Sequence, residues 1–347
     1  MKATSLKTAA IMAASVGLFA GSATAQNSAT SGVVGYETLD YVAGFNYLGL
    51  RLHSNPAVSG ALTGADANGV SDSAVDFSTI LTGETFILEI EDGAGAGIIQ
   101  EVTTTGDDVN EIATQIDLAA EGVAAGDKYT LRAAATLESV FGAANEAGLA
   151  PGQGGSAGST QVWLPDGAGG FDQYYYFVDP FFGTEEWRTV VGDTAVTPAD
   201  VNIVYTDAIV LNAAGAGSIV VTGDLKTSPT SIALTSSFNY VGSVYPVGAT
   251  IESTFGAANE AGLTPGQGGS AGSDQIWIHQ GGPDFDRYFY FVDPFFGTEE
   301  WRDVATNAAI PTGENSPSLD AASGYILLNG GEFNNVDTTA PGFYEDL

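Results

Sequence analysis

The sequence predicts an all-β protein, built mainly of antiparallel sandwich or barrel-like units with one short helix in each of two repeat units. Three observations lead to this fold class. Short β-type runs recur along the chain, Gly-rich turn signals separate them, and no regular alternation of strands with long helices is seen. Hydrophobic residues make up 44% of the 347 residues, enough for a sizeable core.

The most informative feature is an internal repeat. Residues 137–188 align without a gap onto residues 251–302, at a constant offset of 114 and with 39 of 52 positions identical. The shared stretches include FGAANEAGL, PGQGGSAGS and YFVDPFFGTEEWR. A fainter echo joins Phe45–Gly49 to Phe238–Gly242. Such self-similarity indicates two copies of one structural unit.

The spacing of these repeats predicts the domain organisation. A first β unit spans residues 26–229 and a second spans residues 230–347. The first unit carries an inserted β segment at about 57–135, because its repeats lie further apart than those of the second. Within the insertion, alternating and β-branched runs predict three strands, at Thr85–Ile90, Gly97–Thr103 and Lys128–Ala133.

Each copy is predicted to contain one helix of three turns. Thr136 suits the N-cap position and Gly148 the left-handed stop, with Thr250 and Gly262 in the same places in the second copy. The apolar residues at helical spacing in the first copy are Leu137, Val140, Phe141 and Ala144.

The N-terminal residues have the pattern of a secretory signal peptide. Lys2 and Lys7 form a positive region, Ala9–Gly21 is a short apolar stretch, and Ala23-Thr24-Ala25 fits a cleavage site. Residues 1–25 are therefore predicted to be a signal peptide, and the protein to be exported to the extracellular space, the cell surface or the periplasm. Beyond them no run reaches the roughly 18 apolar residues of a spanning helix, so no transmembrane segment is expected in the mature chain.

The composition excludes several classes of partner and cofactor. The chain has no cysteine, which excludes disulfides and thiolate chemistry. Its 42 acidic and 9 basic residues give a net charge of −33, which would repel phosphate backbones and argues against nucleic acid as a partner. No cofactor is indicated other than calcium, for which Asp284 and Asp286 form a weak D-x-D candidate; a solvated acidic surface is the alternative explanation of the charge.

The residues also resemble a known family. Phe238–Gly256, FNYVGSVYPVGATIESTFG, follows the run VVTGDLKTSPTSIAL, and each copy continues into an aromatic strand that ends near a Trp. This pattern resembles an uncharacterised family of exported bacterial proteins best represented in verrucomicrobial genomes. The resemblance implies export and a β-rich fold, and it brings no functional residues with it.

Catalytic constellations are sparse. His53 and His279 are the only histidines, and the repeat aligns His279 with Pro165, which disfavours a repeated histidine site. Paired carboxylates remain an alternative, because acid/base glycoside hydrolysis needs two of them across a sugar. The candidates are Asp172, Asp179, Glu185 and Glu186 with their repeats Asp286, Asp293, Glu299 and Glu300.

Aromatic residues suggest a second alternative, carbohydrate binding. Along Phe171–Val178 the side chains alternate between two faces, and the loss of a hydroxyl from Tyr175 to Phe289 marks its face as core. The opposite face, together with the tryptophans, would stack on sugar rings of an extracellular polysaccharide. The candidates are Trp163, Tyr174, Tyr176, Trp187, Trp277, Tyr288, Tyr290 and Trp301.

These observations favour a non-enzymatic function. The leading hypothesis is an exported, non-catalytic structural, surface-layer or adhesive protein of the cell envelope or extracellular matrix, acting by self-association or by binding polysaccharide. It rests on the tandem units, the sulfur-poor acidic composition and the sparse catalytic candidates.

Overall fold

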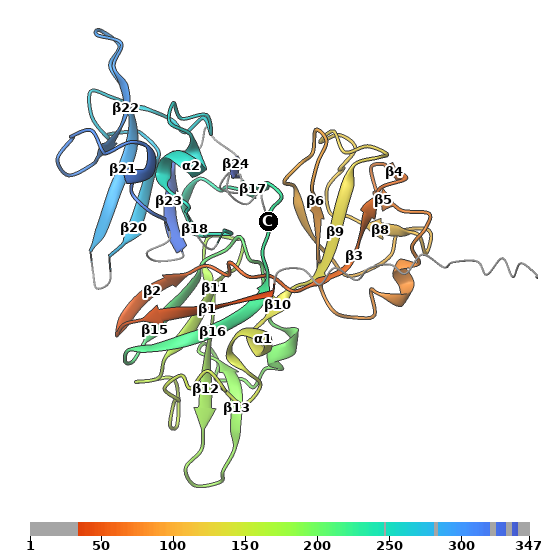
Figure 1. The fold of residues 1–347 in the computed structure, drawn as a ribbon. Helices are drawn as coiled ribbons and strands as arrows, with labels where there is room; N and C mark the ends of the chain where they lie inside the picture. The colour runs from red at the N-terminus through yellow and green to blue at the C-terminus, as the bar shows by residue number, and fades with distance from the viewer. Residues whose placement is uncertain (1–33, 246–247, 281–283, 320–323, 331–334, 339–347) are drawn as a thin grey trace, which may run out of the picture. The chain divides into compact units, whose positions relative to one another are not determined.

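The structure is a computed structural model that describes residues 34–245, 248–280, 284–319, 324–330 and 335–338 (Figure 1). Antiparallel strands dominate these residues, and their two α-helices have only five residues each. The prediction of an all-β fold with short helices is therefore confirmed. Among the residues described, no helix has the length and apolar character needed to cross a membrane.

Three strands of the first repeat copy join β15 and β2, which lie outside it, in a five-stranded antiparallel sheet of order β13-β12-β11-β15-β2. One face of this sheet bears Val162, Leu211 and Leu48, which belong to a buried core shared with the helix α1 (Leu137–Phe141). The strands are β13 (Glu185–Thr189), β12 (Phe171–Val178), β11 (Gln161–Pro165), β15 (Ile209–Ala213) and β2 (Gly44–Leu48).

The second copy forms a sheet with the same order of equivalent strands. Its order is β18-β23-β20-β21, and β22 pairs with the free edge of β21. The helix α2 (Ile251–Phe255) packs on it through a separate core that contains Ile251 and Phe255. The strands are β18 (Ser237–Gly242), β23 (Gly324–Asn329), β20 (Gln275–His279), β21 (Phe285–Val292) and β22 (Glu299–Asp303), with β19 (Gly266–Gln267) parallel to β21.

The segment inserted in the first copy has its own core, centred on Leu88, Tyr129 and Leu131. Its three predicted strands are observed as β6 (Phe86–Ile90), β7 (Ile99–Val102) and β9 (Lys128–Ala133), which form a sheet with β3 (Pro56–Ala61). A second small sheet contains β4 (Gly64–Ala65), β5 (Gly69–Ser71) and β8 (Glu111–Ala113), and a 3-10 turn, η1, spans Phe77–Thr79.

The remaining strands form two-stranded ladders. They are β1 (Val34–Tyr41) with β16 (Gly217–Asp224), β10 (Ala135–Thr136) with β14 (Asn202–Ile203), and β17 (Thr230–Ala233) with β24 (Asn335–Thr338). The 3-10 turns η2 (Pro198–Asp200) and η3 (Gly313–Asn315) complete the described elements.

The prediction of a three-turn helix in each copy is wrong in length. Thr136 does form the N-cap, in a capping box with Ser139, but the helix ends at Phe141. Gly142 follows with φ of 88°, a conformation that stops the helix, and its N–H still bonds to Glu138. Gly148, the predicted stop, lies in a later turn at φ of 69°.

Candidate functional site

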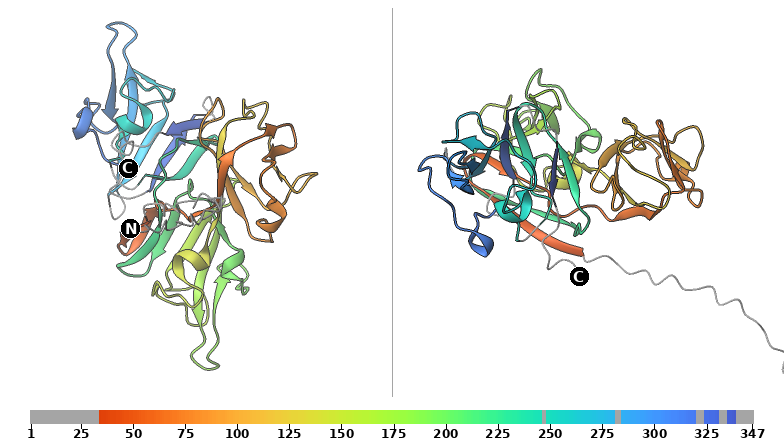
Figure 2. Two further views of the ribbon diagram at one scale, coloured as in Figure 1. Left: turned by 45° about the vertical axis from the view of Figure 1, so that its right-hand side comes forward. Right: turned by 90° about the horizontal axis from the view of Figure 1, so that it is seen from above.

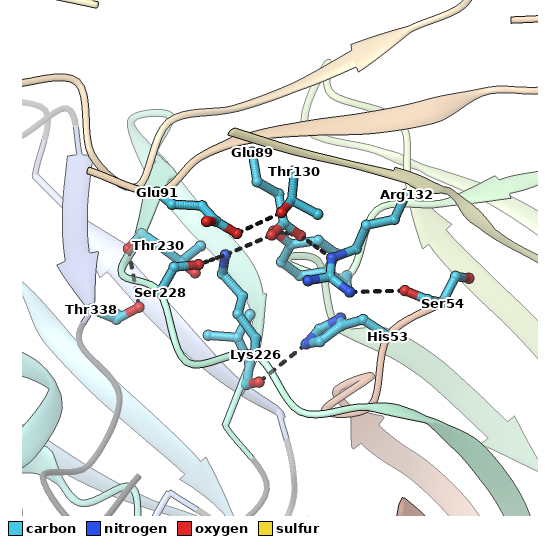
Figure 3. Close-up of polar contacts among 12 residues, drawn as sticks. His53, Ser54, Glu89, Glu91, Thr130, Arg132, Lys226, Ser228, Thr230 and Thr338 are labelled. Carbon is cyan, nitrogen blue, oxygen red and sulfur yellow. Dashed lines mark hydrogen bonds and ion pairs between the residues drawn. The ribbon is translucent and has the colours of Figure 1, made fainter. Parts of the chain in front are cut away.

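The most heavily buried polar cluster of the described residues centres on Glu89 of β6. Its Oε1 accepts hydrogen bonds from Arg132 Nε at 2.9 Å and from the Tyr205 hydroxyl at 3.0 Å. Its Oε2 accepts one from Lys226 Nζ at 3.0 Å. Figure 3 shows the side chains of Arg132 and Lys226 converging on this carboxylate. We refer to Glu89, Arg132, Tyr205, Lys226 and the adjacent His53 as the Glu89 cluster.

Burial sets the electrostatics of this cluster. The side chains of Glu89 and Lys226 are each 1% exposed. Burial alone would raise the pKa of Glu89, but Lys226 and then Arg132 outweigh it, and the pKa is lowered. Burial lowers the pKa of Lys226, against the opposing effect of Glu89. Burial also lowers the pKa of His53 to about 4, although Glu89 opposes this shift, so the imidazole is neutral at pH 7.

The Glu89 cluster joins parts of the chain that are far apart in sequence. Glu89 and Arg132 belong to the inserted segment, whereas Tyr205 and Lys226 follow the first repeat copy. Arg132 also donates from Nη1 to the backbone oxygen of Ser54, at 2.9 Å. Each charged group has a bonded partner. The cluster is therefore a buried network of ion pairs and hydrogen bonds that can fix the insertion to the rest of the fold, and we call this role a clasp.

Most of the predicted sugar-binding aromatics are placed in the two cores, which corrects the prediction for them. Trp187 is 1% exposed, packs edge-on against Tyr176 at 5.5 Å and donates from its indole N–H to the backbone oxygen of Gly142. Trp301 and Tyr290 repeat this arrangement. The strand alternation was predicted correctly, but the helix covers the face that was assigned to ligand. The residues so buried are Tyr176, Trp187, Tyr288, Tyr290 and Trp301, and Tyr174 is half-buried against the same core.

The two remaining tryptophans lie on the opposite face of their sheets and are half-buried. Trp163 contacts Phe45 at 5.2 Å, and its indole N–H donates to Gln161. Trp277 contacts Phe238 at 5.3 Å in the same way, and the guanidinium of Arg287 lies over its ring at 5.3 Å. The structure therefore leaves Trp163 and Trp277 as the aromatic candidates that a ligand can reach.

The predicted glycosidase carboxylates have mainly local structural partners. Asp179 caps the hairpin turn that follows β12, and Asp293 does the same after β21. Glu186 and Glu300 form ion pairs of 2.6 Å with the arginines two residues further on. Glu185 and Glu299 are exposed at the starts of β13 and β22, and Asp286 is exposed on β21.

Asp172 lines a cavity of about 290 Å³ together with Glu101, Asp166 and Asp207. Burial, and then the charge of Glu101, raises the pKa of Asp207 to about 7. Burial also raises the pKa of Glu101. A carboxyl group that is partly protonated at neutral pH can donate a proton or a hydrogen bond, which is the property that general acid catalysis uses. Sequence reasoning did not identify Asp207 or Glu101.

The calcium candidates Asp284 and Asp286 are both exposed. Within the described part of the chain, no group of three or more His, Asp or Glu side chains is placed to hold a metal ion. Calcium binding stays a prediction.

Each repeat copy ends its aromatic strand in a hairpin loop that presents two phenylalanines to solvent. Phe181 and Phe182 are 89% and 87% exposed between β12 and β13, and Phe295 and Phe296 are 90% and 87% exposed between β21 and β22. Each loop extends past the neighbouring strands of its own sheet (Figure 1, Figure 2). We call these two Phe-Phe loops the hairpin tips.

The hairpin tips are ordered turns. In the first, the Asp179 carboxylate accepts hydrogen bonds from the backbone N–H groups of Phe181 at 2.7 Å and Phe182 at 3.0 Å. Backbone bonds from Gly183 to Asp179 and from Asp179 to Thr184 close the loop. Asp293 makes the equivalent bonds in the second tip, at 2.8 and 3.0 Å. The turn therefore holds both rings outward without using them in packing.

Comparison with known proteins adds no further assignment. No family model matches the chain, and no curated protein and no solved structure is significantly similar to it.

Proposed function

We propose that this chain is an exported, non-catalytic structural or adhesive protein of the cell envelope or extracellular matrix, and that it attaches to other macromolecules through the hairpin tips. The observation that supports the proposal is the exposure of four phenylalanine side chains, each 87–90%, at two equivalent turns. Soluble proteins rarely expose paired large apolar side chains in this way unless the surface has a binding role.

The energetics favour binding through the tips. Transferring one phenylalanine side chain from water into an apolar site contributes about 1.5–3 kcal/mol. The closed turns at Asp179 and Asp293 lower the entropy lost on binding, because they already fix the backbone that carries the rings. Two tips on one chain also allow simultaneous attachment, which raises the apparent affinity without further contacts.

Removing the four rings should release the protein from the envelope or matrix fraction. We expect the variant Phe181→Ser, Phe182→Ser, Phe295→Ser, Phe296→Ser to fall at least tenfold in the insoluble fraction of producing cells, while its melting temperature stays unchanged. Cell fractionation with and without a chelator, followed by immunoblotting, measures both the attachment and its dependence on calcium.

Val191→Ser provides a matched control, because Val191 is 82% exposed and lies outside both tips. That variant should fractionate as the wild type does. A wild-type protein found only as free soluble monomer, or a tip variant that stays fully attached, would contradict the proposed function.

Carbohydrate binding is the second candidate, favoured by the half-buried positions of Trp163 and Trp277 beside exposed Phe45 and Phe238. An indole face flanked by amide side chains suits the C–H face of a sugar. If this candidate is right, binding to a polysaccharide array should disappear in the double variant Trp163→Ala, Trp277→Ala. It should persist in Arg287→Gln, which uncovers the Trp277 ring. Equal binding by wild type and double variant would eliminate it.

A further inference from the structure

A second feature of the chain complements the hairpin tips. A cavity of about 120 Å³ lies beside the Glu89 cluster, and its lining is mixed: apolar Leu50, Leu52 and Ile87 lie beside polar Ser54 and Ser139. Val220 also lines it and is 60% exposed, which places it at the opening. The guanidinium-bearing side chain of Arg132 forms part of the wall.

The size and chemistry of this cavity suit a phenyl ring. A cavity of about 150 Å³ accommodates benzene when its lining is apolar, and the present one has a similar volume, a mixed lining and an opening. An arginine in the wall favours an aromatic occupant, because a guanidinium is attracted to the face of a ring. The chain already pairs arginine with phenylalanine in this way, with Arg188 at 3.8 Å from the Phe177 ring centre and Arg302 at 3.5 Å from that of Phe291.

We propose that one phenylalanine of a hairpin tip inserts into this cavity on a second copy of the same chain, so that the protein self-associates head to tail. The inference rests on the proposed function, since it names the partner of the tips. Because the tip and the cavity are different surfaces, the contact is heterologous and does not close on itself as a symmetric dimer does.

The numbers of tips and cavities give the assembly a definite stoichiometry. The cavity includes Ile87 and Arg132 of the inserted segment, which the second copy lacks. Each chain therefore has two hairpin tips but one described cavity of this kind. The expected assemblies are chains with occasional branches, in which each molecule accepts one tip and offers two.

A bilayer is a less suitable occupant than a second copy. The chain carries a net charge of −33, which opposes approach to anionic lipid. The same charge makes copies repel each other, so added salt should strengthen an association that is driven by apolar insertion. A contact driven by ion pairs would weaken instead.

Sedimentation velocity of the mature protein, residues 26–347, tests the inference. Wild type should form species larger than monomer as its concentration rises from about 1 to 100 µM, and more so in 300 mM than in 20 mM NaCl. The quadruple tip variant and the cavity variants Val220→Asp and Thr222→Trp should each weaken association at least tenfold. Both cavity positions are exposed, so the variants should keep the wild-type melting temperature.

Mixing the variants gives the sharpest test. A cavity variant retains two tips and a tip variant retains one cavity, so a 1:2 mixture should form complexes that stop at three chains. Val191→Ser should associate like the wild type. If wild type stays monomeric, if the tip and cavity variants associate normally, or if the mixture forms no complex, self-insertion is overturned.

The outcomes separate this inference from the proposed function. Tip variants that lose envelope attachment while cavity variants keep it would leave the tips as binding elements with a different partner. Binding of the wild type to neutral phosphatidylcholine vesicles, lost in the tip variant alone, would assign that partner to lipid and would overturn self-insertion. Tip variants without effect in any assay would remove both proposals.

Discussion

Glu89→Gln should lower the free energy of unfolding by about 3–5 kcal/mol, because it removes the anion that two buried cations share. The side chains of Glu89 and Lys226 are each 1% exposed, so water cannot replace the lost partner. A neutral amide retains a hydrogen-bonding oxygen for Arg132 or Tyr205 but offers no compensating charge. Chemical denaturation at pH 7, followed by tryptophan fluorescence, measures the change.

A compensating variant separates charge from packing in this cluster. Lys226→Met added to Glu89→Gln removes one of the two buried cations, and we expect it to recover a substantial part of the lost stability. A second expectation concerns pH. Burial disfavours the charged form of Lys226, and in Glu89→Gln no carboxylate compensates for it, so the pKa of Lys226 falls further. Glu89→Gln should therefore become less destabilising as the pH rises towards 10 and Lys226 loses its proton in both the folded and the unfolded state. A loss below about 1 kcal/mol would show that the cluster is solvated and not a clasp.

Asp207→Asn should stabilise the protein at pH 8 by about 4 kcal/mol and leave it nearly unchanged at pH 4. The pKa of Asp207 is raised to about 7 in the folded state, from an ordinary value of 3.8, by burial and then by Glu101. The folded state therefore holds this proton more tightly than the unfolded state. The stability it contributes is present in full below pH 4 and is lost as the pH rises to about 7. An asparagine cannot ionise and avoids that loss.

His53 has the opposite dependence over the same range. Its pKa falls to about 4 in the folded state, from 6.5, so its contribution is lost as the pH falls from 6.5 to 4. In the wild type the two effects offset each other. Asp207→Asn should therefore show a steeper loss of stability on acidification, of the order of 3 kcal/mol between pH 7 and pH 4. Asp207→Glu retains an ionisable group and should keep the wild-type shape. Parallel pH profiles for Asp207→Asn and wild type would contradict the raised pKa of Asp207, and a flat profile for Asp207→Asn between pH 7 and pH 4 would contradict the lowered pKa of His53.

The sequence was sufficient to predict the fold class. It was not sufficient to predict which face of each strand is covered by other parts of the chain and which face is exposed to solvent. Alternation along β12 correctly separated Tyr175 from Tyr176, because the side-chain period of a strand is two. In the structure both are buried: α1 and its core cover Tyr176, while the turn at Gly152 packs directly on Tyr175. Covering by a loop has no periodic signature, so a pattern within one strand cannot reveal it.

The Glu89 cluster illustrates what sequence reasoning missed. Glu89 lies in the strand FILEI, where all five residues are buried, and a charged residue in such a run is the one available signal. Its partners lie 43, 116 and 137 residues away along the chain. Only the three-dimensional pairing of the insertion with later segments brings them together. The prediction of the helix length was wrong for a local reason. The alanines after Gly142 favour a longer helix, but the positive φ of Gly142 ends it.

The paired strands of the two sheets are separated by different lengths of chain, and this difference has a consequence for folding. Equivalent asparagines, Asn46 and Asn239, each bond across to a backbone oxygen of the neighbouring strand, but over sequence separations of 165 and 88 residues. Closing the longer loop costs more chain entropy, by about 0.6 kcal/mol for a doubling of length, and long-range pairing slows folding. The half of the chain that a ribosome makes last is thus the half that reaches its native pairing over the shorter path. The earlier half has to close a loop that contains the whole insertion before its edge strand pairs.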